Sequence, residues 1–202
     1  MSLVDVHLIC GTREPWLDDC LASLKDEPIT LWPIDRIEGD TAAARERGFR
    51  CGTLPYVSFV DPDDMVVPGI FQQCADLLDE NPDLVGVYTD ELLVNRRGEY
   101  LMDGWSLDDT PFLRFGYRQA LMQGIHHLHV LRREVVEQCL PLKTKRMPEP
   151  VLMHELAQFG DLHHLCEVGY FWRIHGKNTF FSYTTDELDE AMQCVEAIHA
   201  SD

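Results

Sequence analysis

The chain has 202 residues, of which 45% are hydrophobic and 26% charged, and this composition is ordinary for a globular protein with one sizeable core. The formal net charge of −18 at pH 7 disfavours nucleic acid and anionic membranes as partners, because both are bound mainly through Lys and Arg. No apolar run reaches the about 18 residues of a membrane span, and we expect neither a transmembrane segment nor a secretory signal.

The seven cysteines are scattered, odd in number and never spaced as Cys-x-x-Cys. Several lie in apolar surroundings, where a reduced cysteine behaves as a small hydrophobic residue. The cysteines therefore predict a cytoplasmic protein without a disulfide framework. The length predicts one domain over residues 1–202.

Strand and helix patterns alternate through the first half of the chain. In order, they predict a strand over 4–10, a helix over 15–25, a strand over 29–34, a helix over 42–50, a strand over 57–60, a helix over 70–78 and a strand over 84–89. Such alternation favours an α/β fold with a mostly parallel central sheet and helices on both faces.

The second half is less regular. A hairpin turn over 95–98 leads to a short strand over 99–101 and a polar loop over 103–111. The remaining predicted elements are helices over 112–122, 133–140, 151–159 and 186–200, and strands over 127–131 and 167–173, with a basic loop over 143–150.

An acidic cluster follows the short apolar strand over 57–60. Asp61, Asp63 and Asp64 come directly after it, and Pro62 cannot continue a strand ladder. Ligands of open α/β sheets bind at the carboxyl ends of strands, and Mg²⁺ is usually held by one or two carboxylates together with substrate phosphates. The cluster predicts a metal–diphosphate site, and the alternative is an acidic turn that caps the next helix.

Four stretches resemble family 2-type glycosyltransferases, whose fold is called GT-A. In chain order they are LICGTREPWLDDCLASL, TAAARERGFRCGTLPYVSFVDPDD, GVYTDELLVNRRGEYL and YFWRIHGKNT. The second resembles the family's Ala-Ala-Arg-Asn-x-Gly segment leading into its Asp-x-Asp strand, and the fourth its Arg-x-His-Gly segment. The resemblance implies a GT-A domain with a nucleotide-binding half over about 1–100 and an acceptor-side half over about 101–202.

The resemblance implies roles for matching residues. Asp61 and Asp63 match the Asp-x-Asp pair that binds nucleotide ribose and the divalent ion, and Asp64 matches the neighbouring acid. His175 matches a late histidine that completes the metal shell, and its alternative is a turn histidine that bonds the backbone. The nucleotide-binding residues implied in the first half are Cys10, Thr12, Asp35 and Arg45, although Arg45 has the alternative of a solvated helix charge.

The chain departs from the family pattern in two places. Only about fifteen residues separate the first helix from TAAARERG, which leaves room for one strand where the family has two. The family's catalytic Glu-Asp pair is replaced by Met147-Pro148-Glu149-Pro150, so Glu149 is the carboxylate in place to act as the base. The alternative is that Glu149 is only an acidic residue at the N-terminus of the next helix, where the helix dipole stabilises a negative charge. The two flanking prolines bias its backbone toward extended conformations.

The expected activity is transfer of a sugar from a nucleoside-diphosphate sugar to an acceptor hydroxyl, with inversion and with Mn²⁺ or Mg²⁺. The resemblance favours UDP over GDP, while the acceptor stays open among saccharides, lipid-linked molecules and proteins. The alternatives are a nucleotide-sugar-binding protein without transfer activity and a metal-dependent nucleotidyltransferase. The absence of a Gly-rich phosphate loop near Gly11 disfavours the nucleotidyltransferase.

Overall fold

The computed structural model describes residues 1–12, 14–104, 125 and 127–200. The helix expected over 112–122 and most of the polar loop expected over 103–111 lie outside these residues. Within them, none of the helices combines the length and the apolar character that a transmembrane span requires.

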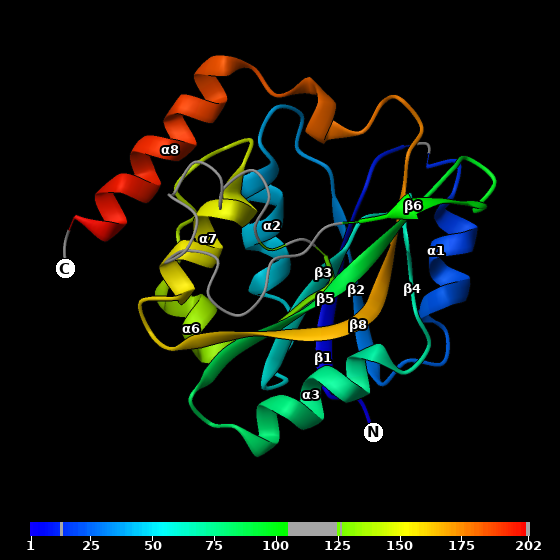
Figure 1. The fold of residues 1–202 in the computed structure, drawn as a ribbon, viewed down its shortest axis with the longest axis horizontal. Helices are drawn as coiled ribbons and strands as arrows, with labels where there is room; N and C mark the ends of the chain where they lie inside the picture. The colour runs from blue at the N-terminus through cyan, green and yellow to red at the C-terminus, as the bar shows by residue number, and fades with distance from the viewer. Residues whose placement is uncertain (13, 105–124, 126, 201–202) are drawn as a thin grey trace.

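The described strands form an eight-stranded sheet in the order β2-β1-β3-β7-β5-β8-β4, with β6 paired to β5 (Figure 1). The strands are β1 (Val4–Cys10), β2 (Ile29–Asp35), β3 (Tyr56–Val60), β4 (Met65–Val66), β5 (Leu84–Val94), β6 (Tyr100–Asp103), β7 (His129–Arg132) and β8 (Asp161–Arg173). The long strands β5 and β8 curl together through the middle of the molecule.

The expectation of a mostly parallel sheet is wrong, because the sheet is mixed. β1 runs parallel to β2 and β3, and β5 runs parallel to β8. β7 is antiparallel to both β3 and β5, while β4 is antiparallel to β8 and β6 to β5. Strand–helix alternation predicts parallel neighbours only where a helix connects them, whereas β7 inserts from the irregular second half between two strands that run the other way.

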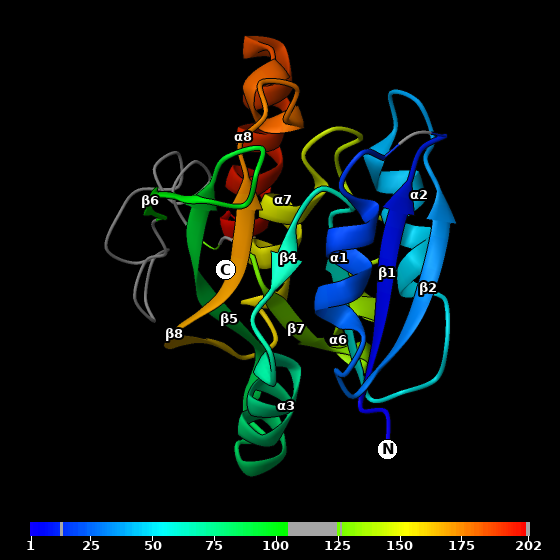
Figure 2. The same cartoon turned by 90° about the vertical axis from the view of Figure 1, so that its right-hand side faces the viewer.

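Helices cover both faces of the sheet, as expected. One core cluster packs α1 (Leu17–Leu24) and α3 (Ile70–Glu80) against the strands. A second cluster packs α2 (Thr41–Phe49), α6 (Arg133–Gln138) and α7 (Pro148–Leu156) on the opposite side (Figure 2). The last helix, α8 (Thr185–His199), packs on α7 through a smaller cluster.

Two strands extend well beyond their predicted bounds. β5 continues through Asp90 and Glu91 to Val94, although the sequence places these two acids just past the strand end. β8 begins at Asp161 and pairs with β5 along its length, with register shifts on both sides of Asp90. Pairing with a long neighbour therefore carries both strands through polar residues, and the irregular register accommodates them.

Candidate active site

A cleft opens beside the carboxyl ends of β1 and β3. Its cavity measures about 870 Å³. Among its lining residues are Arg45, Asp61, Asp63, Glu149 and His175, which come from four separate segments of the chain. The structure thus brings together at one cavity five of the residues that the resemblance singles out.

Arg45 joins two of the carboxylates. Asp40 caps the N-terminus of α2 by accepting a hydrogen bond from the Ala43 N–H at 2.9 Å, and α2 carries Arg45 into the interior at 3% exposure. Its Nη2 lies 2.7 Å from Asp61 Oδ1 and its Nε lies 2.6 Å from Glu149 Oε1. Arg45 is therefore a buried bridge between the acidic loop and α7, rather than a solvated helix charge.

The contact between Arg45 and Asp61 affects the pKa of each of these two groups. Burial opposes the charged form of Arg45, but the carboxylates of Asp61 and Glu149 outweigh it and raise the pKa of the guanidinium. Burial works toward a raised pKa for Asp61, yet Arg45 and then His127 outweigh it and hold that pKa below its ordinary value. Asp61 is consequently an anion whose charge is already largely compensated.

Asp63 and His175 form a separate pair. Asp63 Oδ2 lies 2.6 Å from His175 Nε2, and the Lys177 N–H donates to His175 Nδ1 at 3.3 Å. Burial and the nearby Asp61 raise the pKa of Asp63, although the hydrogen bond to His175 acts in the opposite direction. His175 thus makes the backbone contact of a turn histidine and also reaches the acidic loop.

Asp64 faces different partners from its neighbours. It is 2% exposed and accepts hydrogen bonds from the Tyr170 hydroxyl at 2.9 Å and the Arg173 N–H at 2.7 Å. Burial, followed by the charges of Asp63 and Asp61, raises its pKa well above the ordinary range. Both of its oxygens are engaged by β8, so Asp64 fastens the acidic loop to that strand.

Arg173 is a central residue that the sequence analysis did not select. Its side chain is fully buried, and it donates to the Asp63 carbonyl at 2.8 Å and to the Arg96 carbonyl at 3.2 Å. Its Nη2 also lies 3.0 Å from Asp19 Oδ2 on α1. Arg173 therefore ties together three segments around the acidic loop, and the only signal for it in the sequence is its place two residues before His175.

Glu149 lies in the first turn of α7, which begins at Pro148. The expected extended backbone is wrong: the helix starts three residues earlier than predicted. Proline is favoured at the first position of a helix because its fixed φ suits that position and its missing N–H has no helical partner there. The helix dipole favours the negative charge of Glu149 at this position. The same position brings its carboxylate into contact with Arg45.

Three of the predicted nucleotide-binding residues lie at the same sheet edge without lining the cavity. Cys10 and Asp35 are paired in register at the ends of β1 and β2, and Thr12 follows in the exposed turn. Among the residues described, those that line the cavity from this side include Ile9 and Arg36 instead. Arg36 is held by Glu14 at 2.8 Å.

The donor chemistry of Asp63 and His175 fits a divalent ion. In the described part of the chain no three His, Cys, Asp or Glu side chains gather as a metal-binding group, and Asp61 is paired with Arg45. A carboxylate oxygen and an imidazole nitrogen are nevertheless suitable ligands for Mn²⁺, and a diphosphate and water would supply the remaining ones.

Other residues of the cleft were missed by the sequence analysis. His127 has its Nε2 3.9 Å from Asp61 Oδ2 and stacks on Tyr170 at 4.8 Å between ring centroids. Trp16 and Tyr183 also line the cavity. Their positions depend on tertiary contacts between distant segments, and no spacing in the sequence indicates them.

Comparison with solved structures shows a GT-A-like α/β fold. S. aureus TarS 1–349 in complex with UDP-GlcNAc is 12% identical, with a TM-score of 0.71, and the match covers 98% of this chain and 66% of that chain. The same TarS fragment in complex with UDP gives a TM-score of 0.69 at 12% identity, covering 98% of this chain and 65% of that one. This chain thus spans less than two thirds of the length of either.

The sequence gives a second comparison. No curated protein matches it. The model of glycosyl transferase family 2 matches residues 33–140, more than half of the chain, including α2, the acidic loop and β5. The chain therefore belongs to glycosyl transferase family 2.

Proposed function

We propose that this protein transfers a sugar from a UDP-sugar to an acceptor hydroxyl in the cleft beside β1 and β3. One observation carries the proposal: Asp61, Asp63, Arg45, His175 and Glu149 line a single cavity of about 870 Å³. A cavity at strand carboxyl ends that combines acidic, basic and imidazole groups has the composition expected of a site for a charged nucleotide ligand.

Two observations support UDP as the nucleotide of the donor. The family is shown by the sequence match, and TarS, which shares the fold, binds UDP-GlcNAc and UDP. GDP is the alternative nucleotide, and measuring the affinities of the protein for UDP and for GDP decides between them. The acceptor is proposed only as a molecule that presents a hydroxyl group, whether saccharide, lipid-linked or protein.

Asp63 and His175 are the residues that would hold Mn²⁺ or Mg²⁺ with the donor. A bound cation would neutralise the charge that builds on the departing diphosphate. Asp63 contributes a carboxylate whose raised pKa reflects burial beside Asp61, and a cation would favour its ionised form. Asp61, held by Arg45, would accept hydrogen bonds from the nucleotide ribose.

Glu149 is the proposed base. Its carboxylate would take the proton of the acceptor hydroxyl while the acceptor oxygen bonds to the anomeric carbon and UDP departs with the electron pair of the broken bond. Attack from the face opposite the diphosphate inverts the anomeric configuration. Arg45 Nε donates to Glu149 Oε1 at 2.6 Å, so the other oxygen, Oε2, is the one that would accept the proton.

The same contact favours a second candidate function. A carboxylate engaged by a buried guanidinium can serve as a fixed structural anion that closes one side of the cleft. The protein would then bind a nucleotide sugar without transferring it. The two candidates differ only in turnover, because both predict binding of the donor.

Release of UDP from a panel of UDP-sugars, with saccharide and lipid-linked acceptors, tests the activity. We expect wild-type turnover that rises with an acceptor and is lost in Glu149→Gln and Asp63→Asn. Donor binding without turnover on any acceptor would support the binding function, whereas equal turnover by wild type and Glu149→Gln would remove Glu149 as the base.

A further inference from the structure

The imidazole of His175 is held on its ring face as well as at its nitrogen. Trp16, at the start of α1, stacks on it with ring centroids 4.8 Å apart and an angle of 27° between the ring planes. At the edge of the ring, Nε2 lies 2.6 Å from Asp63 Oδ2, and this contact fixes the direction in which Nε2 points. A stacked ring cannot rotate freely about its side-chain bonds, so the stack limits the orientations of Nε2.

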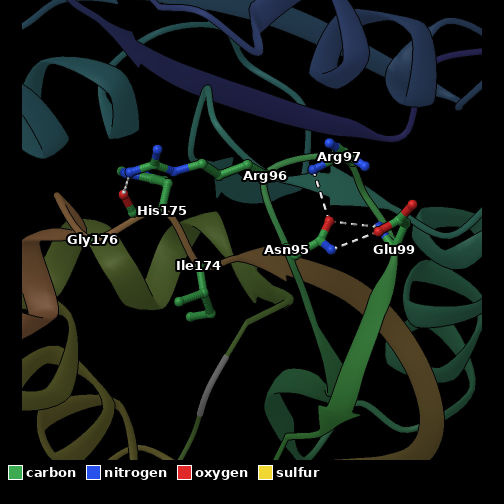
Figure 3. Close-up of a pocket in the computed structure, with 7 residues that line it drawn as sticks. All are labelled: Asn95, Arg96, Arg97, Glu99, Ile174, His175 and Gly176. Carbon is green, nitrogen blue, oxygen red and sulfur yellow. Dashed lines mark hydrogen bonds between the residues drawn. The ribbon is translucent and has the colours of Figure 1, made fainter.

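The backbone of His175 is fixed by the β5–β6 hairpin. Arg96 Nη2 donates to the His175 carbonyl at 2.6 Å, as the dashed line in Figure 3 shows. The Arg96 carbonyl in turn accepts from Trp16 Nε1 at 3.0 Å. Trp16, His175 and Arg96 therefore form a closed ring of contacts that links the start of α1, the hairpin and the segment after β8.

The turn that follows His175 also fixes the position of its backbone. Gly176 has φ of +78°, a left-handed conformation that favours glycine, and it turns the chain back toward β8. Asn178, which follows the turn, accepts from the His175 N–H at 3.1 Å and donates to the Arg173 carbonyl at 2.7 Å. On the hairpin, Asn95 Oδ1 accepts from the Arg97 N–H at 2.8 Å and shapes the turn that presents Arg96.

We infer that Trp16 and Arg96 are positioning residues that hold the His175 imidazole with Nε2 on Asp63. The inference deepens the proposed function and rests on it where the divalent ion is concerned. Residues that orient a metal-ligating histidine typically change metal affinity by about 10- to 100-fold when they are removed. Neither residue touches the reacting atoms in this scheme, and each acts through His175.

The test uses three variants and a matched control. Trp16→Leu removes the stack, Trp16→Phe keeps an aromatic face but loses the indole N–H, and Arg96→Ala removes the donor to the His175 carbonyl. Arg97→Ala is the control, because it removes the same charge from the same turn while its side chain points away from His175 in Figure 3. Any change caused only by net charge must appear equally in Arg96→Ala and Arg97→Ala.

The first readout needs no metal. In EDTA, the His175 ring-proton resonances, identified by their loss in His175→Gln, should be shifted upfield by the facing indole. We expect that shift to disappear in Trp16→Leu, to be largely retained in Trp16→Phe and to change in Arg96→Ala but not in Arg97→Ala. Unchanged resonances in both Trp16→Leu and Arg96→Ala would overturn the inference.

The second readout is the Kd for Mn²⁺ in the presence of UDP. We expect it to rise about tenfold or more in Trp16→Leu and Arg96→Ala, with Trp16→Phe and Arg97→Ala close to wild type. Equal Kd values in all variants would overturn the role of the two residues toward the ion. Absence of Mn²⁺ binding by the wild type would instead contradict the metal in the proposed function, and the resonances in EDTA would still decide whether Trp16 and Arg96 position His175.

Discussion

Glu149 and Asp61 share one guanidinium, and this arrangement determines what each carboxylate can do. Arg45 is 2.6 Å from Glu149 and 2.7 Å from Asp61 and lies 3.8 Å from the centre of the Phe59 ring. A buried cation between two acids is stabilised by both, and loss of either partner leaves it incompletely compensated. A substitution at Glu149 therefore tests chemistry and structure together.

Glu149→Gln should keep UDP affinity within about threefold of wild type and abolish sugar transfer. The amide oxygen can still accept from Arg45, so we expect a stability loss of only about 1–2 kcal/mol from the lost charge. Glu134→Gln, in the exposed first turn of α6, is the matched control for the helix dipole. Thermal unfolding and UDP release measure the two effects, and a Glu149→Gln protein that transfers sugar at the wild-type rate would contradict the base assignment.

Glu91 gives the protein a specific dependence of stability on pH. It is 2% exposed in β5, and burial, followed by the charge of Asp90, raises its pKa to about 8. In the unfolded chain a glutamate ionises near pH 4.3, so between that pH and about 8 the unfolded state loses a proton that the folded state keeps. Stability must therefore fall as pH rises through this window, by up to about 1.4 kcal/mol per pH unit.

Glu91→Gln should remove that slope, because an amide does not titrate. The free energy of unfolding, measured with urea at several pH values from 5 to 8.5, should fall less steeply with pH in Glu91→Gln than in wild type. Glu80→Gln, at the exposed end of α3, should retain the wild-type slope. Parallel pH profiles for wild type and Glu91→Gln would show that Glu91 ionises in the folded protein as it does in the unfolded chain.

Helices and strands differed in how well the sequence predicted them. The periodic apolar positions of α1 and α3 located both helices, because their buried faces repeat at helical spacing. β5 and β8 were predicted too short, since the residues beyond the predicted bounds are held in strands by pairing with each other and, at the end of β5, with β6. The direction of β7 is set by its neighbours β3 and β5, and no local pattern of four residues carries that information.

The last helix, α8, begins with an N-terminal capping box. The Thr184 hydroxyl accepts from the Glu187 N–H at 3.3 Å, and Glu187 Oε2 accepts from the Thr184 N–H at 2.8 Å, which completes a capping box. Thr184→Ala should lower stability by about 1 kcal/mol, while Thr185→Ala, one residue further on, should not lose a cap. Thermal unfolding distinguishes them, and equal melting temperatures would show that the cap contributes nothing measurable.

For the site as a whole, the resemblance located the separate residues but not their pairing. It indicated Asp61, Asp63 and His175, and the structure places all three at one cavity. It did not indicate that Asp61 would turn to Arg45, or that Trp16 would cover His175. Such contacts join segments far apart in the chain, so they follow from the tertiary structure and have no signature in local spacing.

The charge of the whole molecule bears on the same site. A net charge of −18 attracts a divalent cation and repels a free diphosphate. A cation placed between Asp63 and the diphosphate would reverse the repulsion. We therefore expect the affinity for UDP to depend strongly on a divalent ion, even though the cleft also contains cationic side chains.

Calorimetric titration of UDP, with Mn²⁺ and with EDTA, tests the central claim most directly. We predict that wild type binds UDP in Mn²⁺, more tightly than GDP, and that affinity falls at least about tenfold in EDTA, in Asp63→Asn and in His175→Ala, while the melting temperatures in EDTA stay close to wild type. Equal UDP affinity in Mn²⁺ and in EDTA, or no binding of UDP under either condition, would contradict the account.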